Sequence, residues 1–299
     1  MRVVIIGGSG LIGRALRQEL TGHGHQVTVL TRSTGSQEHP DFALAEWDGK
    51  DEKRLTELLD GQKAVVNLAG ESIGKGRWSP QRKQTILSSR LEPGTALVAA
   101  LNSLAKGPRV IVQASAIGYY GTGAETLDEN SPAGTDWLAE VCRQWEGRLS
   151  GLQRKEIRQV ILRNGVVLVR EGGVLAQLSL PVRLFVGGPL GNGKQWISWI
   201  HLTDEVRAIR FLLENAACAG VYNLTAPEPV NNRQMGQALA RQLHRPFWLP
   251  LPAFALRMLL GEMSLLVLEG QRVLPKRLQQ AGFEFAYPDV VTALKDLYR

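Results

Sequence analysis

Short apolar runs alternate with longer amphipathic stretches over the first 170 residues of the chain. The longer stretches repeat their apolar residues at helical spacing, whereas the short runs are rich in Val, Ile and Leu and have the length of buried strands. This alternation is typical of a parallel sheet covered by helices on both faces. We therefore predict an α/β fold, a doubly wound parallel sheet of the Rossmann type over residues 1–170. Its predicted strands are Val3–Ile6, Gln26–Leu30, Phe42–Glu46, Ala64–Leu68, Val110–Ala114 and Val160–Leu168.

The pattern changes at about Gly172, where a second region begins. Residues 171–250 are predicted to form a substrate-side region, within which elements at about 200–225 return to the first domain. Asp204 is the expected N-cap of a helix that ends near Asn215. Residues 251–299, rich in Pro and Leu, predict a small helical domain. Together, 171–299 form a smaller, mainly helical substrate region.

Composition and charge argue against several classes of partner, namely metal ions, nucleic acid and membranes. The 299 residues are 44% hydrophobic and 21% charged, as in a globular protein, and the two cysteines stand far apart. This cysteine usage predicts a cytoplasmic protein with no disulfide framework and no metal site. The net charge of +7 is scattered without a run of five cations, so we expect no nucleic-acid partner. The longest apolar stretch, Ala253–Leu268, is short and carries two charges, so we expect no membrane partner either.

Three glycines follow the first predicted strand at fixed spacing. Gly7, Gly10 and Gly13 stand between the apolar run Met1–Ile6 and an amphipathic stretch, and a second strand comes next. In a strand–turn–helix unit such glycines allow a tight turn, close approach of the backbone to a pyrophosphate, and close packing of helix on strand. The order of these elements predicts a dinucleotide site; the alternative is an ordinary glycine-rich turn.

The end of the second strand bears on the choice of cofactor. Thr31 and Arg32 stand there, and the next acidic residue is Glu38. A carboxylate at this point selects NAD, whereas a guanidinium can grip the 2′-phosphate of NADP through two hydrogen bonds. We therefore predict NADP(H) as the cofactor. The alternative is that Arg32 is a solvated surface residue.

Five motifs occur in one order along the chain: Gly7–Gly13, Asn67–Glu71, Ser115–Gly121, Gly187–Gly191 and Trp199–His201. Together they resemble the NAD(P)-dependent epimerase/dehydratase branch of the short-chain dehydrogenase/reductase superfamily. More narrowly, the chain is similar to its "epimerase family protein" group, whose members end in a small helical domain. The resemblance implies an NADP(H)-dependent oxidoreductase or epimerase that acts on a sugar-like or small carbonyl or alcohol substrate. It also makes a homodimer possible.

The resemblance also assigns individual cofactor contacts. It places the glycine turn on the pyrophosphate, Thr31 and Arg32 on the adenosine phosphate, and the end of the fourth strand along the cofactor. Arg90 would reach back toward the cofactor, and Val167 would abut its nicotinamide side. The alternatives are a helix-surface arginine and a core valine. The implied residues are Gly7, Ser9, Gly10, Leu11, Ile12, Gly13, Thr31, Arg32, Leu68, Ala69, Gly70, Glu71, Arg90 and Val167.

The resemblance is incomplete at the catalytic residues. In this superfamily a tyrosine, activated by a lysine four residues later, exchanges the substrate proton, and a serine holds the substrate oxygen. Ser115 fits the serine, and Tyr119 is a substitute proton donor; their alternatives are a serine bonded to local backbone and an aromatic lid. Between Gly121 and Arg154 there is no tyrosine and no lysine.

The helix that should carry the tyrosine–lysine pair is Asp136–Glu146. Its apolar stripe predicts packing, with no acid–base group that points inward. Weaker candidates for chemistry are His201 and Glu71, while Gln195, Trp196 and Trp199 could form a substrate wall. The missing pair leaves a rival hypothesis open, that of an NADPH-binding sensor or scaffold with little turnover.

Overall fold

The computed structural model describes residues 1–33 and 40–299. Over these residues the main sheet has seven strands, all parallel, in the order β11-β7-β5-β4-β1-β2-β3. Strand order reverses between β1 and β4, which is where doubly wound sheets bind ligands. The predicted Rossmann fold is confirmed. The strands are β1 (Arg2–Ile6), β2 (Gln26–Thr31), β3 (Ala43–Glu46), β4 (Ala64–Asn67), β5 (Val110–Ala116), β7 (Arg158–Asn164) and β11 (Gly220–Leu224).

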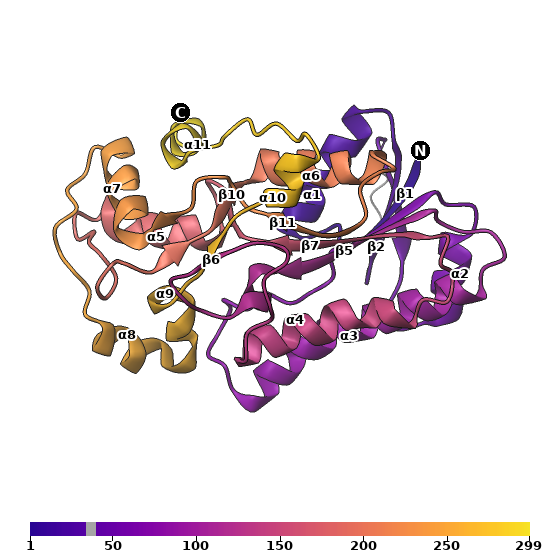
Figure 1. The fold of residues 1–299 in the computed structure, drawn as a ribbon, viewed down its shortest axis with the longest axis horizontal. Coiled ribbons are helices and arrows are strands. Elements are labelled where there is room, and N and C mark those ends of the chain that lie inside the picture. The colour runs from indigo at the N-terminus through magenta and orange to yellow at the C-terminus, as the bar shows by residue number, and fades with distance from the viewer. Residues whose placement is uncertain (34–39) are drawn as a thin grey trace.

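Helices cover both faces of this sheet (Figure 1). On one face lie α1 (Leu11–Gly22) and α6 (Leu202–Glu214); on the other lie α2 (Glu52–Leu59), α3 (Pro80–Ser103) and α4 (Trp137–Gly147). Because side chains alternate along a strand, Val3 and Ile5 of β1 join the core beneath α1 and α6, while Val4 and Ile6 join the core above α3. Both faces are apolar, which explains the nearly continuous Val/Ile/Leu runs of the strands.

Most of the remaining elements lie on the side of the molecule away from β1, while η2 packs on α3 and α10 on β11 (Figure 1). Small pairings link them: β8 lies parallel to β10, β9 antiparallel to β12, and β6 parallel to β13. The strands are β6 (Thr126–Leu127), β8 (Val166–Leu168), β9 (Trp196–Ile197), β10 (Trp199–His201), β12 (Val230–Asn231) and β13 (Arg272–Val273). The helices are α5 (Gly173–Arg183), α7 (Asn232–Gln242), α8 (Ala253–Leu260), α9 (Leu265–Leu268), α10 (Lys276–Gln280) and α11 (Val290–Leu297), with 3-10 turns η1 (Ile117–Tyr120), η2 (Arg148–Gly151) and η3 (Gly261–Ser264).

The predicted strand Val160–Leu168 is two strands. It breaks at Gly165, where β7 leaves the main sheet and β8 pairs with β10 instead. A Cβ on Gly165 would lie 2.6 Å from the carbonyl oxygen of Ser198, so only glycine allows the two backbones to approach this closely. The apolar run continues through the break because both halves are buried, and it therefore concealed the boundary.

The start of α6 also differs from the prediction. His201, not Asp204, is the N-cap: its Nδ1 accepts a hydrogen bond from the backbone N–H of Thr203 at 3.1 Å. Asp204 lies in the first turn, fully buried, and its carboxylate accepts hydrogen bonds from the backbone N–H groups of Ala286 and Tyr287. It ties the C-terminal segment to α6 instead of capping the helix.

Among the described residues, no helix has both the length and the hydrophobicity needed to cross a membrane.

Candidate functional site

The turn between β1 and α1 is shaped by close backbone contacts. Gly7 has φ +78°, and a Cβ on it would lie 2.8 Å from the carbonyl carbon of Leu68 at the end of β4. A Cβ on Gly13 would lie 2.5 Å from the Cα of Gly8, so α1 packs directly on the turn. These two glycines therefore have the steric roles that their spacing predicted.

The first turn of α1 is open to a ligand. Gly10 is the N-cap, with extended backbone and no side chain to cap the helix. Ser9 and Gly10 are exposed, and Leu11 and Ile12 are half-buried beside them. Backbone N–H groups at the start of a helix have no partner within it and lie at its positive end, which makes this turn suited to a phosphate.

Thr31 and Arg32 end the strand beside β1. The pairing of Ile6 with Leu30 places them at the carboxyl edge, next to the glycine turn. The hydroxyl of Thr31 donates to the carbonyl of Ser33 at 3.1 Å, while Arg32 is exposed. Glu38, the next acid along the sequence, lies outside the described residues.

The chain after β4 is held from behind by buried polar contacts. Asn67 is fully buried; its amide donates to Gln113 Oε1 at 3.0 Å, and its Oδ1 accepts the backbone N–H of Ala69 at 3.1 Å. This arrangement turns Leu68, Ala69 and Gly70 along the edge of the sheet, against the glycine turn. The sequence motif that begins at Asn67 thus has a structural reason.

Arg90 braces the same loop from α3. Its Nη2 donates to the carbonyl of Glu71 at 3.0 Å, and its guanidinium lies over the Trp145 ring, 4.9 Å from the centroid. Burial lowers the pKa of Arg90 below its ordinary value. Arg90 is therefore held against the loop after β4 and is not a solvated residue on the surface of α3. The Glu71 backbone N–H is bonded to Ser89, and its carboxylate lies 3.5 Å from Arg82.

A row of polar side chains crosses three strands at the same edge. Ser115 of β5 is the register partner of Arg163 in β7, which is in turn the partner of Asn223 in β11. Residues paired in this way point to the same face of a parallel sheet. Ser115, Arg163 and Asn223 are all buried, in strands that are otherwise mostly apolar.

Glu146 of α4 meets this row. The hydroxyl of Ser115 donates to Glu146 Oε1 at 2.6 Å, and Arg163 donates from Nε to Oε1 and from Nη2 to Oε2, each at 2.9 Å. Burial acts to lower the pKa of Arg163, but its hydrogen bonds and charge attraction to Glu146, together with the Tyr120 hydroxyl, raise it above its ordinary value. The prediction that α4 carries no inward-pointing acid–base group was therefore wrong.

The two adjacent tyrosines have different surroundings. Tyr119 is half-buried, with the Arg163 guanidinium 3.3 Å from its ring centroid. The Tyr120 hydroxyl accepts from Arg163 at 3.0 Å and donates to Asn223 at 2.7 Å. Burial raises the pKa of Tyr120 to about 12, so this phenol keeps its proton near neutral pH. Tyr120 therefore belongs to the buried network, and Tyr119 stays the more accessible phenol.

Cys142 lies one helical turn before Glu146, beside Ser115. Burial raises the pKa of its thiol to about 12, so the sulfur is uncharged near neutral pH. Cys142 and Glu146 are four residues apart on one face of α4, which is the spacing that the superfamily uses for its tyrosine and lysine. The residues that sequence reasoning missed are thus Glu146, Arg163 and Asn223. The available signals were the place of Glu146 on the stripe of Cys142 and Leu149, and an arginine inside a strand.

The weaker candidates on the substrate side have different structural roles. Trp199 is fully buried and donates its Nε1–H to the carbonyl of Glu228, so it cannot line a substrate wall. Burial lowers the pKa of His201, which caps α6 as a neutral side chain. Gln195 donates to the carbonyls of Leu190 and Val267, joining the glycine loop to α9. Val167 is half-buried in β8, packed against the core beneath α6.

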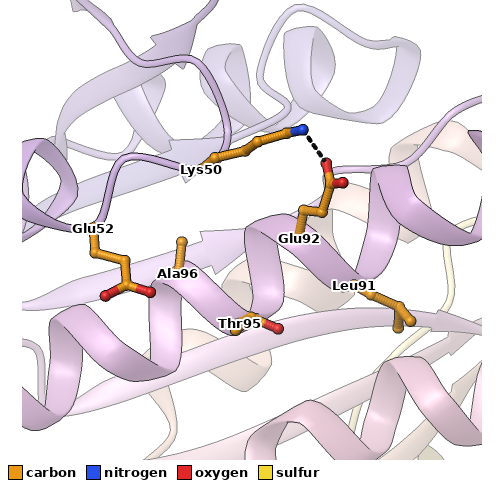
Figure 2. Close-up of a pocket in the computed structure, with 6 residues that line it drawn as sticks. All are labelled: Lys50, Glu52, Leu91, Glu92, Thr95 and Ala96. Carbon is orange, nitrogen blue, oxygen red and sulfur yellow. Dashed lines mark ion pairs between the residues drawn. The ribbon is translucent and has the colours of Figure 1, made fainter.

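A surface hollow lies elsewhere, between the start of α2 and the middle of α3 (Figure 2). An ion pair joins Lys50 to Glu92 across it at 3.2 Å. None of its lining residues belongs to the glycine turn or to the Ser115 network, so we do not place the candidate site there. The lining residues are Lys50, Glu52, Leu91, Glu92, Thr95 and Ala96.

Comparison with known proteins agrees with this geometry. Residues 3–138 match the NAD dependent epimerase/dehydratase family, and residues 251–297 match a domain of unknown function, DUF1731. The chain is 45% identical to the "Epimerase family protein SDR39U1 homolog, chloroplastic" of Arabidopsis thaliana, over 99% of this chain and 86% of that protein. It is 38% identical to the epimerase family protein YfhF of Bacillus subtilis, over 99% and 98% of the two chains.

A solved structure extends the likeness to three dimensions. The human epimerase family protein SDR39U1, crystallised with NADPH, superposes with a TM-score of 0.90 at 33% identity, covering 100% of this chain and 99% of that one. The likeness spans the glycine turn, the Ser115 edge and the C-terminal helices alike. The chain belongs to the NAD-dependent epimerase/dehydratase family of extended short-chain dehydrogenases/reductases, in the group of epimerase family proteins that end in the DUF1731 domain.

Proposed function

We propose that this protein binds NADP(H) at the glycine turn and uses it in an oxidoreductase or epimerase reaction. The observation that carries the cofactor choice is Arg32, exposed at the carboxyl edge beside the turn that suits a pyrophosphate. A cation there complements the 2′-phosphate that distinguishes NADP from NAD. The NADPH in the human relative supports the same choice.

The other proposed contacts follow the same edge. Gly7, Ser9, Gly10, Leu11, Ile12 and Gly13 would hold the pyrophosphate, with Thr31 beside Arg32 at the adenosine phosphate. Leu68, Ala69, Gly70 and Glu71 would line the cofactor, with Arg90 acting through the carbonyl of Glu71, and Val167 would flank the nicotinamide. The bonds of Asn67 and Arg90 support this assignment, because they hold the loop in place before any ligand arrives.

The cofactor, when bound, supplies hydride chemistry at its nicotinamide ring. The chain's own contribution is to hold and move a proton. Ser115 would hydrogen-bond the oxygen of a carbinol or carbonyl substrate while its own proton is shared with Glu146 Oε1. When an alcohol is oxidised, the alcohol proton moves to Ser115 Oγ as the Ser115 proton moves to Glu146; reduction reverses both transfers. Arg163 keeps the carboxylate aligned.

Tyr119 would lie over the substrate as a second hydroxyl, with Arg163 against its ring. The substrate class remains a sugar-like or small carbonyl or alcohol compound, enclosed between the carboxyl edge and residues 171–250. We keep the cytoplasm as the proposed location and a homodimer as the proposed assembly. The plant relative is chloroplastic by name, so the location can differ within the family.

One observation favours the second candidate function, an NADPH-binding sensor or scaffold. Glu146 receives three hydrogen bonds, two of them from a buried arginine, and such a tied carboxylate is a weak base. A protein without turnover would need this network only to shape its pocket.

Cofactor choice is tested by titrating NADPH and NADH against the protein and two variants. Arg32→Asp should weaken NADPH binding by at least about tenfold and leave NADH binding within about threefold, because only the phosphate loses its partner. Lys155→Asp is the matched control, since it removes an exposed cation before β7, at the amino edge of the sheet. Equal affinities for NADPH and NADH in the natural protein would refute the proposal.

Turnover is tested on a panel of sugars, nucleotide sugars, aldehydes and ketones, with NADPH absorbance as the readout. Ser115→Ala and Glu146→Gln should keep NADPH binding and lose at least about a hundredfold in rate on any compound that reacts. Cofactor binding without reaction across the panel would select the sensor or scaffold.

A further inference from the structure

Large apolar side chains are exposed on and near α5 and α8, which lie at the same end of the molecule as α7 (Figure 1). Met258 is 75% exposed, Phe254 68% and Trp248 63%, which is unusual for side chains of this size. We call this the α8 surface. It comprises Leu180, Leu184, Phe185, Val186, Trp248, Leu249, Leu251, Phe254, Met258 and Leu259.

Backbone hydrogen bonds hold the two segments of this surface together. Trp248 donates its backbone N–H to Gly187 at 2.8 Å and its indole N–H to the carbonyl of Phe185 at 3.0 Å. Leu251 donates to Pro189 at 2.9 Å and accepts from Gly191 at 2.8 Å. Residues 185–191 and 248–251 are therefore held side by side, and α8 follows directly after them in the chain.

Two details show that these side chains are presented outward. Phe185 has φ +64°, a left-handed conformation that is costly for a bulky residue, and its ring is exposed. In α8, Leu256 alone is buried, while Phe254 and Met258, one turn apart, face away from the protein. This eight-residue helix is apolar on both sides, and one of its faces has no partner among the described residues.

The charge of the same segments is one-sided. Residues 172–203 and 229–261 contain six lysines and arginines and no aspartate or glutamate. Glu262, the first acid after this stretch, is paired with Lys83. Both stretches are net positive, and acids border them directly at Glu171, Asp204, Glu228 and Glu262. The exposed cations are Arg183, Lys194, Arg233, Arg241, Arg245 and Arg257.

Arg245 shows how the cations and the apolar residues combine. Its guanidinium lies 4.6 Å from the centroid of the Phe185 ring, with the charged group at the surface beside exposed Trp248. Aromatic rings flanked by arginines, with leucine and methionine between them, are the composition of segments that lie in a membrane interface. A surface association of this kind needs no spanning helix.

We propose that the α8 surface docks on an anionic lipid bilayer. Charge decides between the possible occupants: a second copy would bring two net-positive surfaces together, whereas anionic headgroups complement Arg245, which lies over Phe185, and Arg257 of α8. The exposed Trp and Phe rings enter the interface while the arginines stay at headgroup level. The proposal does not depend on the proposed cofactor site, because it uses none of the residues at the carboxyl edge of the sheet.

The test uses the full chain and vesicles of phosphatidylcholine, alone or with one third phosphatidylglycerol, separated by flotation. Binding to the anionic vesicles, weak binding to the neutral ones, and release by high salt are expected. Arg245→Glu with Arg257→Glu should weaken binding by at least about twenty-fivefold, at about fivefold per cation. Phe254→Ser with Met258→Ser should weaken it by at least about tenfold.

Matched controls remove similar groups elsewhere. Val291→Ser replaces an exposed apolar residue of α11, and Lys53→Glu with Lys155→Glu reverses two exposed cations near α2 and β7. Both should bind as the natural protein does. Unchanged NADPH binding in every variant shows that the fold is intact.

Four outcomes would overturn the proposal. They are equal binding to neutral and anionic vesicles, no binding to either, binding that survives both α8-surface variants, and equal affinity for soluble polyglutamate, which would point to an acidic protein partner. A dimer in sedimentation that the Phe254→Ser, Met258→Ser variant dissolves, without vesicle binding, would assign the surface to a second copy.

Discussion

Glu205 offers a direct test of how burial acts in this fold. It lies in the first turn of α6, is fully buried, and neither of its carboxyl oxygens has a hydrogen-bond partner among the described residues. Burial raises its pKa from 4.5 to about 8, so the side chain is protonated in the folded protein at neutral pH. Glutamine has nearly the same shape and cannot ionise.

The sign of the effect follows from proton linkage. The folded state binds this proton more tightly than the unfolded state, so the contribution of Glu205 to stability is complete below pH 4.5. It is lost as the pH rises through about 8. At 1.36 kcal/mol for each pKa unit, the loss at pH 7 is about 3 kcal/mol. Glu205→Gln removes this dependence. The free energy of unfolding of the variant, relative to that of the natural protein, should therefore rise by about 3 kcal/mol between pH 5 and pH 8.

Urea unfolding from pH 5 to pH 8 measures this gap, with tryptophan fluorescence and circular dichroism required to coincide so that one transition is followed. Glu171→Gln is the control, because it changes an exposed carboxyl on the loop before α5 and should shift stability by a similar small amount at every pH. A Glu205→Gln difference that stays constant across this range would refute the reasoning, since it would mean that ionisation of Glu205 costs nothing.

Three further outcomes follow from the site. Arg163→Met should lower the free energy of unfolding by about 3–5 kcal/mol, because it leaves the largely buried Glu146 carboxylate without its counter-ion, and the free energy of urea unfolding of Arg163→Met with Glu146→Gln should recover part of the loss. Gly13→Ala should weaken NADPH binding by about tenfold or more in a titration, since its Cβ would meet the glycine turn. Gly22→Ala, near the end of the same helix with no atom within 4 Å of its Cβ, should raise thermal stability or leave it unchanged.

Local sequence features were sufficient to predict the fold and the shape of the glycine turn. The spacing of Gly7, Gly10 and Gly13 states a steric requirement that any strand–turn–helix must meet, and apolar periodicity states which face of each element is buried. Both are properties of neighbouring residues, so they can be read without knowing the rest of the molecule. The helix caps at Ser79 and Asn231 are local in the same sense, because each side chain accepts the backbone N–H of the residue three positions later.

The polar network around Ser115 depends on contacts between residues that lie far apart in the chain. Ser115, Arg163 and Asn223 form one row because β5, β7 and β11 pair in a particular register, and Glu146 completes it because α4 packs over that edge. The α8 surface is likewise recognised only once it is known that no part of residues 1–33 and 40–299 covers it. Register and coverage arise from non-local packing, which no window of sequence contains, so they became known only when the folded chain could be described.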